Sequence, residues 1–354
     1  MVLSVGDISE DDIADVARFL ARQTRPGEAV GASPMTAERR LRWLLLENPS
    51  RASDIPLGWR IRDDGTVVGA AVCMPFRIGA GDFRATALQF AKFFVDADYR
   101  GMGLGILMRF VHEGRRFPLF CTSTNAKSGE LFFRLGGSLI AGLDHTMLGI
   151  VRPAPLIDEW LFRRTRRPLL ARRLASPIPA MMAPARRLAR RRDLIRGVNL
   201  FPLHDVEEAA AIGLPPPAAA LAIVRDREYL RWRYFSGERE RDVYCFRRKS
   251  ECDRLVVVEE IRSGYRGQIR VLNVLDIWPP PTPDSTAPLA AALAHRYRGR
   301  FDTIWMRGQS PAAEKALGAA GFLRHVFPAP LGWFIDSENR LPTNQWYLMP
   351  GESE

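Results

Sequence analysis

The sequence predicts an α/β fold, with helices flanking mixed sheets, in two similar domains. A chain of 354 residues is longer than the roughly 100–200 residues of a typical domain. Hydrophobic periodicity switches between helical and strand spacing through residues 1–150, and the same alternation returns through residues 200–350. We therefore predict domains at residues 1–151 and 200–354, joined by an arginine- and proline-rich linker at 152–199.

Repeated landmarks predict that the second domain is a duplicate of the first. Such repetition at one offset is the signature of a copied structural unit. The repeated landmarks, which lie 184 to 189 residues apart, are Leu41-Arg42-Trp43 with Leu230-Arg231-Trp232, the helix-ending Gly136 with Gly321, and the strand at 120–124 with that at 304–308.

Composition excludes several classes of protein. With 47% hydrophobic and 26% charged residues, the chain is neither globally disordered nor collagen-like. No apolar run reaches the roughly 18 residues of a membrane-spanning helix, and the acidic N-terminus does not resemble a secretory signal. The four cysteines, Cys73, Cys121, Cys245 and Cys252, show no metal-binding spacing. We therefore expect a cytoplasmic protein with reduced thiols and no metal.

The net charge of +11 is concentrated in one segment. Residues 152–200 contain thirteen arginines and three acids, whereas the rest of the chain is nearly neutral. Three interpretations stay open: a strap that pairs with both domains, a peripheral contact of residues 152–197 with an anionic membrane, or a site for nucleic acid or an anionic substrate. Apolar clusters between the arginines, typical of interfacial helices, favour a membrane over nucleic acid.

The first domain opens with two predicted helices. Residues 7–21 combine candidate caps at Asp7 and Ser9 with apolar residues at helical spacing. A second helix begins at Thr36, a candidate N-cap, and ends before Asn48-Pro49, because the residue before a proline avoids the helical conformation.

A hairpin and a long strand follow. Strands at 58–62 and 66–78 are joined by Asp63-Asp64-Gly65, because Asp-Gly readily adopts the positive φ of a tight turn. The strand at 86–95 runs into a glycine-rich turn and then a helix at 103–113. The domain ends with a strand at 118–124, a helix at 127–135 and a strand at 144–151.

The glycine-rich turn has the features of an anion-binding site. A strand leads through it into an apolar helix, so several backbone N–H groups converge at a helix N-terminus. No Gly-Lys-Ser/Thr ending follows, which excludes a Walker loop, and the even spacing of Gly101, Gly103 and Gly105 departs from the dinucleotide fingerprint. The pattern that remains is R-x-x-G-x-G, from Arg100 to Gly105.

This pattern closely resembles motif A of the GNAT superfamily of acyl-CoA-dependent N-acyltransferases, and the order of predicted elements fits as well. The usual motif is V-x-P-x-[YF]-[RQ]-G-x-G-[IL]-[GA], with Ala97 here in place of the proline. The resemblance implies a central mixed, largely antiparallel sheet flanked by helices in each domain. The matching residues are Val95, Tyr99, Arg100, Gly101, Gly103, Leu104 and Gly105.

The resemblance also implies which residues bind acetyl-CoA or another acyl-CoA. Phe93, Phe94 and Val95 would pair through their backbone with the pantetheine. Asn125 would bond the pantetheine arm, with an ordinary helix-capping role as the alternative. The pyrophosphate would be held by the loop of Arg100, Gly101, Met102, Gly103, Leu104 and Gly105, with the amides of Met102 to Gly105 as donors.

The catalytic residues stay unknown at this point. Where the family has a proton-transferring glutamate and tyrosine, this chain has Gln89 and Phe132, neither of which transfers a proton. Gln89 could still order a water, and the amine could arrive deprotonated. Glu130 and His145 are further candidates for a base, and Cys121 for a covalent acyl relay, with structural roles open for each.

The second domain is predicted to be a degenerate copy that does not bind the coenzyme. Trp278-Pro279-Pro280-Pro281 stands where its loop belongs, and proline lacks the N–H that a phosphate needs. Its helix at 226–234 carries aromatic residues either for the core or for a substrate-facing surface. We therefore expect a tandem N-acyltransferase acting on a small primary amine, or else a non-catalytic acyl-CoA-binding or scaffold protein.

Overall fold

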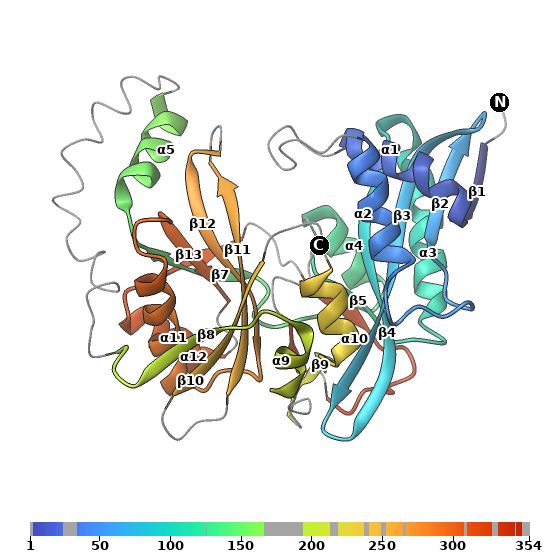
Figure 1. The fold of residues 1–354 in the computed structure, drawn as a ribbon. Coiled ribbons are helices and arrows are strands. Elements are labelled where there is room, and N and C mark those ends of the chain that lie inside the picture. The colour runs from blue at the N-terminus through green and yellow to red at the C-terminus, as the bar shows by residue number, and fades with distance from the viewer. Residues whose placement is uncertain are drawn as a thin grey trace.

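The computed structural model describes most of the chain. Two sheets lie side by side, each flanked by helices (Figure 1). The predicted fold class is confirmed, because both sheets are mixed and largely antiparallel. The described residues are 3–23, 34–124, 126–165, 194–212, 219–236, 241–248, 253–264, 267–307, 310–327, 332–343 and 345–348.

The first sheet has the strand order β1-β2-β3-β4-β5-β15-β6, and its one parallel pair along this path is β4 with β5. Two short strands, β9 (Leu221–Ile223) and β16 (Trp346–Tyr347), extend it beside β3. The main strands are β1 Leu3–Asp7, β2 Gly58–Asp63, β3 Thr66–Ala80, β4 Phe83–Val95, β5 Leu119–Cys121, β6 Ser138–Leu139 and β15 Trp333–Ile335.

The second sheet repeats this arrangement. Its order is β14-β7-β13-β12-β11-β10-β8, and its one parallel pair along this path, β12 with β13, occupies the place of β4 and β5. Its strands are β7 His145–Ile150, β8 Val198–Pro202, β10 Arg241–Arg248, β11 Arg254–Ser263, β12 Ile269–Trp278, β13 Thr303–Met306 and β14 Leu323–Val326.

The two sheets exchange one strand with each other. β15, from the C-terminal part of the chain, lies between β5 and β6, and β7 lies at the equivalent place between β13 and β14. The sheets therefore do not divide at residue 151, where the sequence analysis placed the end of the first domain. The apolar pattern of residues 144–151 predicts a strand, but both sheets offer it the same position, so the pattern cannot indicate which sheet it enters.

The helices begin and end close to the predicted positions, with local differences. A first strand precedes α1, and the helical segment starts at Glu10 rather than Asp7, because Ser9 donates its N–H to the Asp12 carboxylate at 2.8 Å. The helices are η1 Glu10–Asp12, α1 Ile13–Gln23, α2 Pro34–Leu45, η2 Ala97–Met102, α3 Gly103–Glu113, α4 Ala126–Arg134, α5 Pro153–Thr165, α9 Val206–Ala211, α10 Arg227–Leu230, the π-helix η4 Arg231–Phe235, α11 Pro283–Arg296 and α12 Pro311–Ala319.

The repeated Leu-Arg-Trp fragments meet where the two halves pack together. Trp232 Nε1 donates to the Trp43 carbonyl at 3.0 Å, and the two ring centroids lie 5.2 Å apart. Tyr229, Arg233 and Tyr234 are buried beside them. The aromatic helix of the second half is therefore a core element. Of the two roles considered for it, core and substrate-facing surface, the structure shows the first.

A buried ion pair between two residues of the second half also joins the two sheets. Both side chains of Arg225, which follows β9, and Asp276, on β12, are fully buried, and Arg225 Nε lies 3.0 Å from Asp276 Oδ2. Tyr234 donates a further 2.6 Å hydrogen bond to the same oxygen. A buried carboxylate is tolerated because these donors replace its lost hydration.

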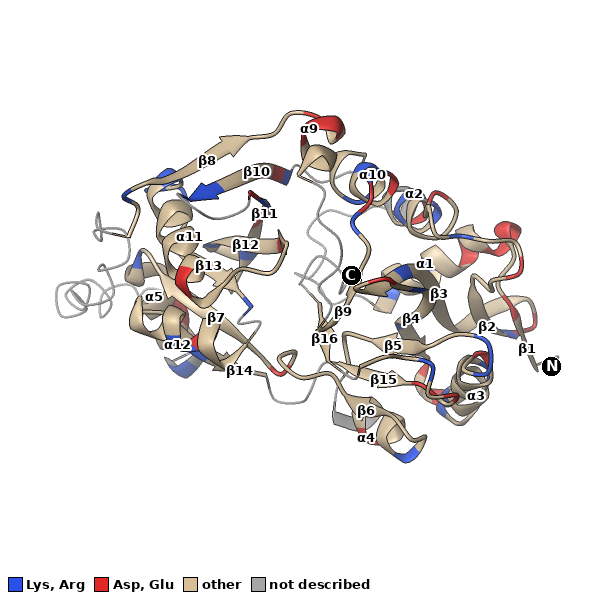
Figure 2. Cartoon of the chain, turned by 90° about the horizontal axis from the view of Figure 1, so that it is seen from below, with Lys and Arg blue, Asp and Glu red and all other residues tan. Residues whose placement is uncertain are grey.

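Helix α5 begins the arginine-rich segment. Glu159 is buried and accepts a 3.3 Å hydrogen bond from Gln268, whereas Trp160 is exposed with the Arg164 guanidinium 5.4 Å from its ring centre. Residues 166–193 lie outside the described residues, so the membrane contact of 152–197 stays a prediction. Elsewhere, basic and acidic positions are interspersed over both halves (Figure 2). No helix in the described part is both long and apolar enough to cross a membrane.

Candidate functional site

β4 and β5 pair over a short distance and then part. Their parallel ladder joins Leu88 to Leu119 and Gln89 to Phe120, after which β4 continues to Val95. β4 also bulges near Lys92, whose φ is 51°, where its register with β3 shifts. A bulge bends its strand. The backbone of β4 beyond Gln89 is therefore left unpaired by β5.

The turn after β4 is fastened to the strands and helix beside it. Tyr99 donates a 2.5 Å hydrogen bond to Asp63 at the end of β2, and this bond raises the pKa of the Tyr99 phenol. Gln23, at the end of α1, donates to the Asp96 carboxylate at 2.6 Å. The position of the turn is thus fixed without any ligand.

The three glycines of the motif differ in what requires them. A Cβ on Gly103 would lie 3.2 Å from Phe93 Cζ and 3.3 Å from Val95 Cγ2, so Gly103 allows α3 to pack on β4. A Cβ on Gly101 or Gly105 would meet no atom within 4 Å, and neither residue needs a positive φ. The folded chain alone therefore gives no reason for glycine at 101 and 105. At the start of a helix, the absence of a Cβ lets an anion come close to the backbone N–H groups, which would explain both glycines.

The donors of the turn are only partly available. Met102 precedes α3 without a side-chain cap, but the Gly103 N–H donates to the Arg100 carbonyl and continues the 3-10 helix η2. Met102 is the last residue of η2, so its N–H is also engaged within that 3-10 helix. Two of the four amides predicted to bind pyrophosphate are therefore engaged. The Arg100 side chain is exposed, and among the described residues it has no hydrogen-bond or ion-pair partner.

The remaining predicted coenzyme residues lie as follows. Phe93 and Val95 are half-buried, and Phe94 is exposed near the end of β4. Met102 is half-buried, and Leu104 is exposed on the first turn of α3. Asn125 lies outside the described residues.

The two positions expected to carry proton transfer are both buried. Gln89 is 1% exposed, and its Nε2 donates to the Thr122 hydroxyl at 2.7 Å. Phe132, on α4, packs its ring against Phe90 and Phe110. Thr122 was not among the predicted site residues, although a hydroxyl residue within the predicted strand at 118–124 is the signal that could have identified it.

Cys121 and Glu130 lack the surroundings of reactive groups. Cys121 is buried beside Trp333, with which it pairs, and burial raises the pKa of its thiol to about 12. The thiol is therefore protonated and unreactive at neutral pH. Glu130 is exposed on α4, where it forms a 2.6 Å ion pair with Arg134.

His145 is not part of this site. It lies on β7 in the second sheet, with Nδ1 2.8 Å from Asp144 and Nε2 2.9 Å from Glu314. Its selection as a candidate base assumed that the strand at 144–151 belongs to the first sheet. The strand exchange removes that assumption.

The second sheet keeps the bulge of the first but lacks its loop. β11 and β12 shift register between Val257 and Val258, as β3 and β4 do. Thr282 then caps α11 by accepting from the Ser285 N–H at 3.3 Å, and Pro283 occupies the first turn. At this helix start the Ser285 amide is thus capped, and Pro283 has no N–H to offer. The described residues contain no group of three or more side chains suited to a metal ion.

Comparisons with known proteins identify the fold. No protein-family model and no curated protein matches the chain. A probable N-acyltransferase of unknown function from Enterococcus faecalis V583 matches at a TM-score of 0.57 and 9% identity, over 94% of this chain and 72% of that one. GCN5-related N-acetyltransferases from Anabaena variabilis (TM-score 0.50, 12% identity, 94% and 72%) and Kribbella flavida (0.52, 16%, 94% and 70%) are also similar. The chain therefore shares the fold of GCN5-related N-acetyltransferases.

Proposed function

We propose that this chain is a tandem GNAT-fold protein that binds an acyl-CoA in its first half and transfers the acyl group to a primary amine. The observation that carries the proposal is the open space at Gly101 and Gly105, at the start of α3 and beside the unpaired end of β4. The fold shared with N-acetyltransferases supports it. In the second half, Thr282 caps one amide of the corresponding helix start and Pro283 lacks an N–H, which supports a degenerate copy.

The proposal assigns each part of the site a task. Acetyl-CoA, or another acyl-CoA, supplies an activated thioester. The amides of Leu104 and Gly105 and the exposed Arg100 guanidinium would bind the pyrophosphate, because a helix start and a cation both stabilise anions. The backbone of Phe93 to Val95 would pair with the pantetheine as an added strand does.

Gln89 and Phe132 carry no titrating group, so neither can remove the proton of the amine or protonate the leaving thiolate. Direct attack requires a neutral amine; the C–N bond then forms as the C–S bond breaks, and the proton that the nitrogen loses goes to the departing coenzyme thiolate. We therefore propose that the amine loses its proton before it binds, so that the rate of transfer rises with pH towards the pKa of the free amine. The same two residues favour the second candidate function, a protein that binds acyl-CoA without transferring it.

Release of the coenzyme thiol tests the proposal. The intact protein is given acetyl-CoA with a panel of amino sugars, amino acids and polyamines between pH 7 and 9.5, with calorimetric binding of acetyl-CoA measured in parallel. Turnover with one amine, rising with pH, supports the transferase. Binding without turnover for any amine supports the non-catalytic alternative, and absence of binding contradicts both.

A further inference from the structure

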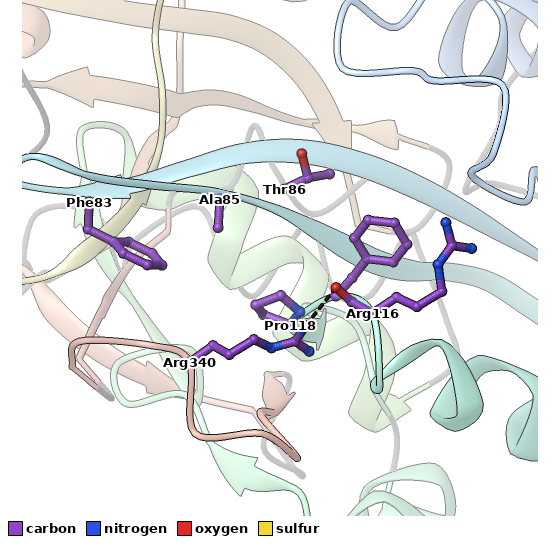
Figure 3. A pocket seen from close by; sticks show the side chains of 7 residues that line it. Phe83, Ala85, Thr86, Arg116, Pro118 and Arg340 are labelled. Atoms are coloured by element: carbon purple, nitrogen blue, oxygen red, sulfur yellow. Dashed lines mark hydrogen bonds between the residues drawn. The ribbon is translucent and has the colours of Figure 1, made fainter.

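A pocket of about 530 Å³ lies at the opposite end of β4 from the glycine-rich turn (Figure 3). Its volume is within the range of sites for small molecules, roughly 300–1,000 Å³. None of the functions discussed above uses it. The lining residues are Phe83, Ala85, Thr86, Arg116, Phe117, Pro118 and Arg340.

The pocket is separate from the proposed coenzyme site. Thr86 is its lining residue nearest to the glycine-rich turn along β4, and the turn begins after Val95. Nine residues of extended strand span about 30 Å at roughly 3.3 Å per residue. The two sites also lie at opposite ends of α3, since Arg116 to Pro118 follow this helix and Gly103 opens it. A ligand in the pocket would therefore leave the coenzyme loop unobstructed.

Arg340 gives the pocket one uncompensated positive charge. Its Nη1 donates to the Arg116 carbonyl and its Nη2 to the Gly114 carbonyl, both at 2.6 Å, so it caps the chain where α3 ends. Within the described part of the chain, no carboxylate lies within ion-pair distance of this guanidinium, and its buried Nε–H has no hydrogen-bond partner. A buried donor without a partner is costly, and an acidic ligand that reached it would remove that cost.

The other arginine of the pocket is already neutralised. Arg116 Nη2 lies 2.5 Å from an Asp54 carboxylate oxygen, and its Nη1 lies 3.3 Å from Glu113. The pocket therefore carries one net positive charge, which suits a ligand with a single acidic group.

Apart from Thr86, the rest of the lining is apolar. Phe83 and Pro118 lie on either side of the hollow in Figure 3, with Ala85 above it and Arg340 below. Phe117 completes this lining. Aromatic rings and a guanidinium plane both stack on flat groups. The ligand that fits is a flat ring with an acidic substituent.

We propose that this pocket binds a small aromatic carboxylate, with the ring between Phe83 and Pro118 and the carboxylate on Arg340. The site is independent of the coenzyme proposal, because none of its residues belongs to the glycine-rich turn. It gives the protein a second ligand, which is either bound alongside the acyl-CoA or recognised as the distal end of the acceptor.

Calorimetric titration with benzoate and benzamide tests the charge requirement. These probes share one ring and differ in charge, so benzoate should bind the intact protein at least about tenfold more tightly. Arg340→Gln should abolish this preference while leaving the weak binding of benzamide unchanged. Equal binding of the two probes, or an undiminished preference in the variant, would overturn the proposal.

A second variant tests the location. Ala85→Phe fills the pocket and removes no hydrogen bond, so benzoate affinity should fall by about tenfold or more, whereas Ala85→Ser should bind as the unaltered protein does. Thermal unfolding and acetyl-CoA binding are followed in both variants. Unchanged benzoate binding in a folded Ala85→Phe protein would overturn the proposed location of the site. Failure of the unaltered protein to bind acetyl-CoA would contradict only the proposed function and not the benzoate site.

Discussion

Gln89 donates a 2.7 Å hydrogen bond to the hydroxyl of Thr122, and this bond joins β4 to the end of β5 at the last pair of their ladder. Both side chains are 1% exposed. The position at which the resemblance to the GNAT superfamily places a glutamate base thus carries an amide that joins two strands. The bond fixes the point from which β4 and β5 part.

Breaking this bond from either side should destabilise the fold. Gln89→Leu and Thr122→Val each remove one buried partner, and each should lower the free energy of unfolding by about 1–3 kcal/mol. The double variant should lose less free energy of unfolding than the sum of the losses in the two single variants, because the second change leaves no new group without its partner. Urea unfolding of the four proteins measures this coupling, and strictly additive losses would contradict it.

The exchanged strand makes the first sheet depend on the end of the chain. β15 lies between β5 and β6, and its residues Trp333, Phe334 and Ile335 are buried. Deleting residues 332–354 should abolish cooperative thermal unfolding, whereas deleting only 349–354 should preserve it. A chain without β15 that unfolds cooperatively at the original temperature would show that the exchange is not required.

The local features of the site could be predicted from the sequence, and its partners across the fold could not. Glycine spacing and strand periodicity act over a few residues, so the strand, turn and helix around Gly103 lie close to their predicted positions. The sheet that β7 joins depends on contacts with Met306 and Val326, more than 150 residues away. His145 was therefore assigned to the wrong sheet, and Trp333 was not considered at all.

The space around each glycine of the motif could not be predicted from the sequence either. The sequence presents Gly101, Gly103 and Gly105 as three equivalent glycines, yet only Gly103 contacts the strand. The β1 strand was missed because five residues containing Gly6 give a weak periodic signal beside strong helix-start residues.

Asp12 should make stability depend on pH in the acid range. Burial would raise the pKa of this carboxyl, but hydrogen bonds from Ser9, Arg60 and Arg62 outweigh burial and hold the pKa far below its usual value. A lowered pKa stabilises the fold above the unfolded value of about 4, and that contribution is lost as the pH falls towards the folded value.

Asp12→Asn tests this dependence. The variant should lose about 3 kcal/mol of stability at pH 7, since it leaves the half-buried guanidiniums of Arg60 and Arg62 without the carboxylate they share. The difference from the unaltered protein should stay constant above about pH 5 and narrow below about pH 4. Urea unfolding at pH 7, 5, 4 and 3 gives the comparison, and a gap that widens in acid would refute the assignment.

The buried thiol of Cys121 should resist alkylation. Because burial raises its pKa to about 12, iodoacetamide at pH 7.5 should modify it about a thousandfold more slowly in the folded protein than in urea. Peptide mass spectrometry follows the modified fraction with time. Rapid labelling of the folded protein would restore Cys121 as a candidate for an acyl relay.

The central claim is that the turn before α3 binds the pyrophosphate of an acyl-CoA, and Gly105 offers the cleanest test of it. Gly103 is unsuitable, because a side chain there would press on Phe93 and Val95. At Gly105 a side chain meets no protein atom, and an acid in the first turn of a helix is favourable for the fold. Gly105→Asp should therefore fold normally while its carboxylate repels a phosphate.

Titration calorimetry with acetyl-CoA on the unaltered protein, Gly105→Asp and the neutral control Gly105→Ala is the most direct measurement. We expect Gly105→Asp to bind at least about tenfold more weakly and Gly105→Ala to bind within a few-fold of the unaltered protein, with neither variant unfolding at a lower temperature. Equal affinity in Gly105→Asp, or no binding by the unaltered protein, would contradict the central claim.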